Sequence, residues 1–224
     1  MNSKKGRIAT GVLSIATMSI VIFFWLETRS STQRQILQYR FMDSVLLTSK
    51  PEKIALGSST IKYWPSQHVP CGPWLNRGIG GATINDVLNY VQDAPGRKVE
   101  SVLLYVGDND IAFGASPLYA LKSAARLIQT IEHRMKPQTL YLLPVKWSPA
   151  RAEFTENFKI FNRRLEQYAS TQASVVYLPH RMQTAAYPPT AGLYLPDGLH
   201  LSTAGYEYMF SSLRKTCVGF KPSR

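Results

Sequence analysis

The stretch Ser101–Asp110, SVLLYVGDND, decides the fold of this chain. Its first six residues, SVLLYV, form an apolar run that carries no charge, and a glycine follows it. A run of this length and composition is typical of a strand buried on both faces of a parallel sheet. In such sheets functional groups gather beyond the carboxyl ends of the strands. The polar residues after the run therefore form a candidate functional loop.

Four shorter apolar runs predict four more strands, which are Lys53–Leu56, Leu75–Arg77, Thr139–Leu143 and Val175–Leu178. Helical patterns lie between them, because apolar residues recur every three or four positions in two long segments, Pro117–Met135 and Arg151–Tyr168. The recurring residues, which we expect in the core, are Leu121, Ala125, Ile128, Met135, Phe154, Phe158, Phe161, Leu165 and Tyr168. This alternation predicts an α/β domain over residues 53–224 with one doubly wound, mainly parallel five-stranded sheet and helices on both faces.

The first strand is followed directly by Gly57-Ser58-Ser59-Thr60. Glycine lets the chain turn sharply, and the N-terminus of the next helix directs backbone N–H groups at developing negative charge. A serine in this place can act as a nucleophile if a base reaches it. Taken alone, the motif is more often a turn with a helix cap.

Two further polar segments follow strands. Asn76–Thr83, NRGIGGAT, has three glycines that let the backbone approach a ligand closely. A phosphate-binding loop is the rival interpretation, but no Gly-Lys-Ser/Thr follows and the dinucleotide fingerprint is absent. In Gly107–Asp110, GDND, the Asn109 amide could donate to an oxyanion, and an Asx turn fits equally well.

The last segment is Pro196-Asp197-Gly198-Leu199-His200, just before the final predicted helix. An aspartate three residues before a histidine can fold back to its Nδ1–H, which fixes the tautomer and leaves Nε2 free as a base. A surface turn beside a helix cap is the alternative. None of the other three histidines has an acidic residue at this spacing.

The order of these four segments and their places at strand ends resemble those of the SGNH/GDSL hydrolases. The family's blocks correspond to GSST, NRGIGGAT, GDND and DGLH, and the resemblance covers about Ile54 to Leu213. GSSTIKYW and LLPVKW look most similar to the platelet-activating-factor acetylhydrolase-like and carbohydrate-esterase branches. One departure is Ser58, where the family often has aspartate.

The resemblance implies a role for five residues. Ser59 matches the nucleophile, and Asp197 and His200 match the acid–base pair. The N–H groups of Ser59 and Gly81 and the amide of Asn109 match the oxyanion hole. The family's reaction is acyl transfer through an acyl-enzyme, which needs no metal and no organic cofactor.

The function implied is that of a serine esterase acting on short-chain acyl esters, such as acetyl esters, of a cell-envelope glycan or lipid. An O-acyltransferase with the same triad and a non-catalytic glycan-binding scaffold are the alternatives. Five aromatic residues could stack on a sugar, although each alone fits core or rim packing better: Trp64, Trp74, Trp147, Tyr187 and Tyr194.

Charge and cysteine content limit the other partners. The formal net charge is +12, but the basic residues are scattered without interleaved aromatics, so we expect a basic solvated surface and no nucleic-acid site. Cys71 and Cys217 lack the neighbouring cysteines or histidines of a zinc site.

The N-terminus reads as a membrane anchor. Ile8–Leu26 is a 19-residue segment without charge, long enough to nearly span a bilayer as a helix. Basic residues within Met1–Arg7 favour a cytoplasmic N-terminus, although Arg29 and Arg34 beyond the span weaken that argument. A cleaved signal peptide is the main competitor, but no good cleavage site follows. We expect residues 1–30 to be a cytoplasmic tail and transmembrane signal anchor, with the catalytic domain outside the cytoplasm, in a bacterium in the periplasm.

A linker helix should occupy residues 31–52, with the amphipathic pattern Gln33–Leu47 and apolar contacts at Ile36, Phe41, Val45 and Leu46.

The family resemblance also implies the strand order 2-1-3-4-5, with the first and last helices on the same face. Cys71 follows the first helix and Cys217 the last, so both should reach the same edge of the sheet. We therefore predict that they form a disulfide, with two unpaired buried cysteines as the alternative.

Overall fold

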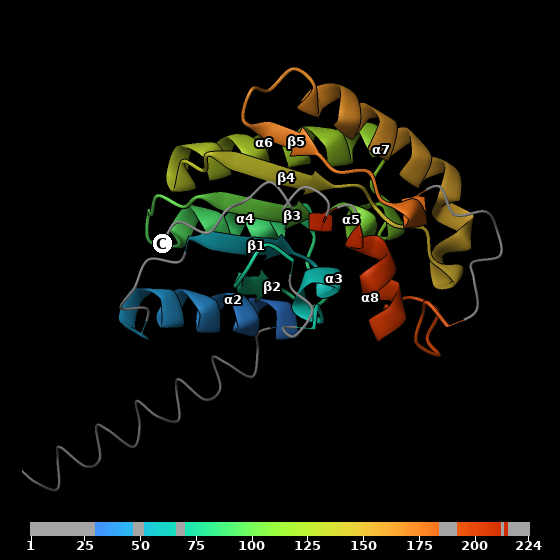
Figure 1. The fold of residues 1–224 in the computed structure, drawn as a ribbon, viewed down its shortest axis with the longest axis horizontal. Helices are drawn as coiled ribbons and strands as arrows, with labels where there is room; N and C mark the ends of the chain where they lie inside the picture. Colours follow the sequence, from blue (N-terminus) through green and yellow to red (C-terminus); the bar gives the residue numbers. More distant parts are fainter. Residues whose placement is uncertain (1–29, 47–51, 66–69, 184–191, 212, 215–224) are drawn as a thin grey trace, which may run out of the picture.

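A computed structural model describes residues 30–46, 52–65, 70–183, 192–211 and 213–214 (Figure 1). Its centre is one five-stranded sheet in the order β2-β1-β3-β4-β5, and every neighbouring pair of strands is parallel. The strands are β1 Lys53–Gly57, β2 Leu75–Gly78, β3 Ser101–Tyr105, β4 Thr139–Leu143 and β5 Val175–Tyr177. The predicted sheet, its order and its five strands are therefore confirmed.

β3 lies in the middle of the sheet, and all five of its residues are buried. Leu103 is in register with Ala55 on one side and with Tyr141 on the other. Successive side chains of a strand point to opposite faces, so a strand covered on both faces needs a continuous apolar run. This requirement explains why SVLLY contains no charged residue.

Three helices cover one face of the sheet: α4 Ile84–Asp93, α6 Pro117–Met135 and α7 Thr155–Ala169. They pack against the strand residues that point to their side, such as Val102 and Leu104. The other face is covered by two short helices, α3 Ser59–Lys62 and α8 Thr203–Met209. They share a core cluster with Leu103 and Tyr105, which point to that side. Figure 1 shows the strand arrowheads pointing toward α3, α5 (Asp108–Ala112) and α8, so these short helices surround the carboxyl edge.

The predicted core stripe is right for α7 and, apart from Ala125, for α6. Phe158, Phe161 and Leu165 of α7 are buried as predicted, and Phe154 and Tyr168 are half-buried. In α6, Ile128 and Met135 are buried, and the half-buried Leu121 packs against the same core cluster. Ala125 is only half-buried. The rest of the buried face consists of Ala120, Ala124, Leu127 and Ile131. Two adjacent apolar rows run along this helix, and periodicity alone does not tell which one faces the sheet.

The predicted linker helix is α2 Ser31–Phe41, which continues as a π-helical turn, η1 Met42–Leu46. Ile36 is buried as expected, but Phe41 and Val45 are each 60% exposed, so these two predicted contacts are wrong. Asp43 is buried instead. A carboxylate can be buried only when charges and hydrogen bonds compensate it, and here α2 brings it to such partners on the domain.

The partners of Asp43 are Arg77, Arg97 and Tyr90. The Arg77 Nη2 atom lies 2.5 Å from Asp43 Oδ1, and both side chains are at most 6% exposed. Arg97 Nη2 lies 3.6 Å from the other carboxylate oxygen, and the Tyr90 hydroxyl donates to that oxygen. α2 is therefore fastened to β2 and α4.

No helix in the described ranges is long and apolar enough to cross a membrane. The predicted span Ile8–Leu26 lies outside those ranges, and so does Cys217. The anchor and the disulfide accordingly stay predictions.

Candidate active site

The turn after β1 sets two serines in different environments. Gly57 has a φ of +149°, and a Cβ added there would lie 2.1 Å from the Tyr105 carbonyl oxygen, so only glycine fits. Ser58, the N-cap of α3, is fully buried, and its hydroxyl donates to Asp108 Oδ1 at 3.2 Å. Ser59 is the first residue of α3 and is half-buried. Of the two hydroxyls, that of Ser59 reaches the surface.

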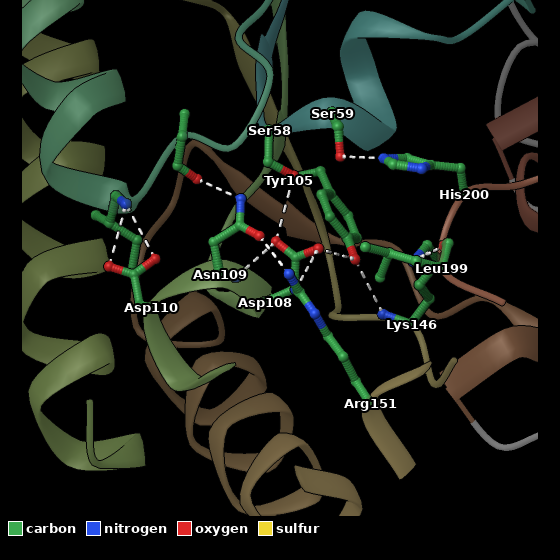
Figure 2. Close-up of polar contacts among 12 residues, drawn as sticks. Ser58, Ser59, Tyr105, Asp108, Asn109, Asp110, Lys146, Arg151, Leu199 and His200 are labelled. Atoms are coloured by element: carbon green, nitrogen blue, oxygen red, sulfur yellow. Dashed lines mark hydrogen bonds and ion pairs between the residues drawn. The ribbon is translucent and has the colours of Figure 1, made fainter. Parts of the chain in front are cut away.

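His200 and Asp197 complete a chain of contacts with Ser59, and Figure 2 shows its Ser59–His200 pair. His200 Nε2 lies 3.2 Å from Ser59 Oγ, and His200 Nδ1 lies 2.6 Å from Asp197 Oδ2. The backbone N–H groups of Leu199 and His200 both donate to Asp197 Oδ1 at 2.9 Å. The hydrogen bonds from His200 and from these two N–H groups lower the pKa of Asp197 to about 2. The carboxylate is therefore ionised at neutral pH and holds the imidazole with Nε2 toward the serine.

An exposed aromatic ring borders the histidine. Tyr63, just after α3, packs edge-on against the His200 ring, with 5.1 Å between centroids and 87° between planes. Its side chain is 52% exposed. Tyr63 is not among the predicted site residues, because nothing in its local sequence pattern indicates contact with a loop 137 residues later in the chain.

A hydrogen bond links Asn109 to Ala82, the neighbour of Gly81, and Gly81 and Asn109 are the other two predicted oxyanion residues. Gly81 has a φ of +69° in the loop after β2. The Asn109 amide Nδ2 donates to the carbonyl oxygen of Ala82 at 2.7 Å. An amide nitrogen carries two hydrogens, so the second remains for another acceptor. This hydrogen bond holds the Asn109 side chain against Ala82, the residue that follows Gly81 in the loop after β2. Figure 2 shows Asn109 near Ser58 and Ser59.

Residues 59–208 match the sequence model of the GDSL-like lipase/acylhydrolase family. The chain belongs to this family. Its fold and its family make it an SGNH serine hydrolase. No curated protein matches the sequence.

Solved structures share the fold of this hydrolase. A Streptococcus pneumonia protein, provisionally named a platelet activating factor, has 22% identity and a TM-score of 0.72, with 90% of this chain and 99% of that chain covered. A GDSL-like lipase from Bacteroides thetaiotaomicron has 17% identity and a TM-score of 0.62, with 83% and 98% covered. A member of the lipolytic G-D-S-L family from Veillonella parvula has 15% identity and a TM-score of 0.60, with 75% and 99% covered.

Behind its site this SGNH hydrolase has a layer of charged side chains with little exposure, which the sequence did not predict. Arg151 Nη2 donates to Asn109 Oδ1 at 2.7 Å, and Arg151 Nη1 lies 3.4 Å from Asp108 Oδ2 (Figure 2). The Tyr105 hydroxyl donates to the same Asp108 oxygen at 3.4 Å. Asp108 also accepts from Ser58, so the serine that departs from the family pattern is paired with a carboxylate of the GDND block.

Lys146 belongs to the same layer and contacts the loop that carries Asp197 and His200. Its Nζ donates to the carbonyl oxygen of Leu199 at 2.9 Å, between Asp197 and His200. Burial lowers the pKa of Lys146 to about 8, although the Asp108 carboxylate opposes this shift. A lysine inside the apolar run LLPVKW is the one sequence signal that could have pointed to this layer.

Asp110, the last residue of GDND, binds the backbone at the start of α4. Both of its carboxylate oxygens accept from the Ile84 N–H, at 3.1 and 3.0 Å, which joins α5 to the start of α4. Burial raises the pKa of Asp110 to about 6.

Three of the aromatic residues considered for sugar stacking make contacts within the protein. Trp64 is buried and stacks on Phe210 with 4.2 Å between centroids. Trp147 is buried and donates its indole N–H to Thr155, and the Tyr194 hydroxyl donates to the Trp147 carbonyl. Trp74 is half-buried against the same core cluster as Trp64, and Tyr187 lies outside the described residues. Core packing is therefore the better interpretation for Trp64 and Trp147.

In the described part of the chain, no group of three or more His, Cys, Asp or Glu side chains could hold a metal ion.

Proposed function

We propose that this SGNH hydrolase cleaves acyl esters through an acyl-enzyme on Ser59. The observation that carries the proposal is the unbroken chain from Ser59 Oγ to His200 to Asp197 at the start of α3. A serine with a base at hydrogen-bonding distance and an ionised carboxylate behind that base has the geometry of an activated nucleophile.

The reaction follows from the atoms present. His200 Nε2 takes the proton of the Ser59 hydroxyl as Oγ attacks the ester carbonyl carbon, and the carbonyl oxygen becomes an oxyanion. His200 then gives this proton to the leaving alcohol oxygen, and the C–O bond breaks to leave an acyl-Ser59. Water attacks the acyl carbon while His200 takes its proton. His200 then gives this proton to Ser59 Oγ as the acyl–Oγ bond breaks, which releases the carboxylic acid and restores the Ser59 hydroxyl.

The proposed oxyanion hole combines three donors, the N–H groups of Ser59 and Gly81 and the Asn109 amide. Asp197 stays ionised and stabilises the imidazolium that forms on His200. Removal of a single oxyanion donor typically raises the barrier by about 3 kcal/mol.

The substrate proposed is a short-chain acyl ester, such as an acetyl ester, of a cell-envelope glycan or lipid. Its support is the resemblance to two family branches and the predicted location. The burial of Trp64 and Trp147 removes two residues that could have stacked on a sugar, so Tyr63 beside His200 is the exposed ring best placed to contact a substrate.

A panel of p-nitrophenyl esters from acetate to palmitate tests the activity, with Ser59→Ala as the matched control. We expect turnover that is highest for the short acyl chains and absent from the variant. Turnover that persists in Ser59→Ala would contradict the mechanism, and a maximum at palmitate would contradict the acyl length. Repeating the acetate assay with an envelope glycan as acceptor separates hydrolysis, which releases acetate, from O-acyl transfer, which leaves the acetyl group on the sugar.

The location proposed is a single-pass anchor through Ile8–Leu26 with the catalytic domain on the extracytoplasmic side. Its support is the uncharged segment and the basic residues before it. The natively expressed protein should fractionate with membranes and resist extraction by salt. A mature chain that begins near Ser30 would show a cleaved signal peptide instead.

A further inference from the structure

One face of α2 lies on the loop that contains the oxyanion glycine. Thr32, Gln35 and Tyr39 are spaced by three and four residues, which puts them on the same side of a helix. The Thr32 hydroxyl donates to the Gly80 carbonyl at 3.0 Å, and the Gly80 N–H donates to Gln35 Oε1 at 3.1 Å. The Tyr39 hydroxyl donates to the Gly78 carbonyl at 3.0 Å.

The Thr32 contact bears directly on the proposed oxyanion donor. The Gly80 carbonyl and the Gly81 N–H belong to one planar peptide unit, in which the C=O and N–H bonds point in opposite directions. A hydroxyl that fixes the Gly80 oxygen on the α2 side therefore fixes the direction of the Gly81 N–H on the other side. A hydrogen bond to the oxygen also polarises the peptide, which strengthens its N–H as a donor.

The loop needs this support because glycine has unusual backbone freedom. Gly81 has a φ of +69°, and the nearest atom that a Cβ there would meet is the Thr32 hydroxyl oxygen at 3.7 Å. Fixing a backbone residue in one conformation costs conformational entropy. With α2 in place, both backbone groups of Gly80 are paired before a substrate arrives.

The helix itself is held firmly at both ends. A capping box at Ser30 begins it, and the buried Asp43–Arg77 pair fastens the turn that follows it. Arg77 also lies over the Tyr39 ring, with 4.9 Å from the guanidinium carbon to the ring centroid, and Arg77 precedes the glycine loop directly. Figure 1 shows α2 beside β2, the strand that leads into the loop.

We propose that Thr32 is a positioning residue for the oxyanion hole and acts through the Gly80–Gly81 peptide. The inference rests on the proposed function of Gly81. Through Thr32, α2 would help to position an oxyanion donor, and α2 is the segment next to the predicted membrane anchor.

The test compares Thr32→Val, which keeps the side-chain shape but removes the hydroxyl, with Thr32→Ser, which keeps the hydroxyl. With p-nitrophenyl acetate we expect kcat to fall about tenfold in the valine variant, less than for loss of a whole oxyanion donor. KM should stay within about twofold because the hydroxyl acts on the transition state. Thr32→Ser should retain most of the wild-type kcat.

Arg40→Ala is the matched control on the same helix. It removes an ion pair with Asp93 and a hydrogen bond to the Asn89 carbonyl on α4, and neither contact touches the glycine loop. We expect this variant to keep kcat. Urea unfolding of all three variants shows whether any kcat loss follows lost stability.

Two results would overturn the proposal. One is a wild-type kcat in Thr32→Val. The other is a kcat that falls alike in the valine, serine and Arg40→Ala variants in proportion to their loss of stability. Failure of the proposed function has a different signature, since the wild-type protein would then lack turnover that depends on Ser59.

Discussion

Replacement of Lys146 by methionine should make the protein more stable and less active. Lys146 is 3% exposed, and its ammonium group donates to the Leu199 carbonyl in the loop between Asp197 and His200. Burial lowers its pKa from 10.5 to about 8. Methionine has a similar length and needs no hydration, but it cannot hold that carbonyl.

The size of the stability change follows from the pKa shift. One pKa unit corresponds to about 1.4 kcal/mol, so keeping Lys146 protonated in the fold costs about 3 kcal/mol. Loss of the hydrogen bond to Leu199 offsets about 1 kcal/mol. The expected gain in the free energy of unfolding for Lys146→Met is therefore about 2 kcal/mol at pH 7.

The gain should depend on pH in a definite direction. Below pH 8 the lysine is protonated in both the folded and the unfolded state, so the wild-type protein carries the full cost. Between about pH 8 and 10.5 the folded state loses the proton first, and the wild-type protein recovers stability relative to the variant. The difference between the two proteins should therefore shrink as the pH rises through this window.

Urea unfolding of both proteins at pH 7, 9 and 10 measures this difference, and Lys159→Met is the control. Lys159 forms an exposed pair with Glu156, so its replacement should change stability by less than about 0.5 kcal/mol at any of these pH values. We also expect kcat of Lys146→Met to fall about tenfold, because the loop that carries His200 loses its tether. A variant that is less stable than wild type at pH 7, or a difference that does not change with pH, would refute the reasoning.

Three further predictions concern the site and the cysteines. Asn109→Ala should lower kcat with p-nitrophenyl acetate about a hundredfold with little change in KM, as expected for a donor to the oxyanion; near-wild-type turnover would remove Asn109 from the site. In the same assay His200→Ala should lose more activity than Asp197→Asn, because the histidine transfers the proton whereas the aspartate orients it; the reverse order would contradict these roles. Cys71 and Cys217 should be joined in protein from its native compartment, consistent with a Cys71 sulfur 3.9 Å from the Leu213 carbonyl oxygen, four residues before Cys217; two free thiols titrated in the non-reduced, denatured protein would exclude the bond.

The sequence predicted the sheet well because its signals are local. A strand such as Ser101–Tyr105, covered on both faces, must be apolar throughout, so its pattern marks its place in the sheet. The polar motifs follow directly after such strands, and a parallel sheet brings their carboxyl ends together. For this reason the sequence alone assigns Ser59, Gly81 and Asn109 to one edge of the sheet.

The contacts that the sequence did not predict join residues far apart in the chain. Asp43 is buried because Arg77 and Tyr90 compensate it, and no pattern near residue 43 reports their presence. Arg151 likewise binds Asn109, 42 residues away, and Lys146 binds Leu199, 53 residues away. Long polar side chains reach such partners through the fold, whereas hydrophobic periodicity reports only the face that a segment buries.

Labelling with a fluorophosphonate probe is the most direct test of the central claim, that Ser59 is an activated nucleophile. Intact mass spectrometry of the full chain should show one phosphonyl adduct, and peptide mapping should place it on Ser59. Ser58→Ala should still be labelled, because the Ser58 hydroxyl is buried and paired with Asp108. Ser59→Ala should remain unlabelled. An adduct on Ser59→Ala, or an unlabelled wild-type protein that is folded, would contradict the account.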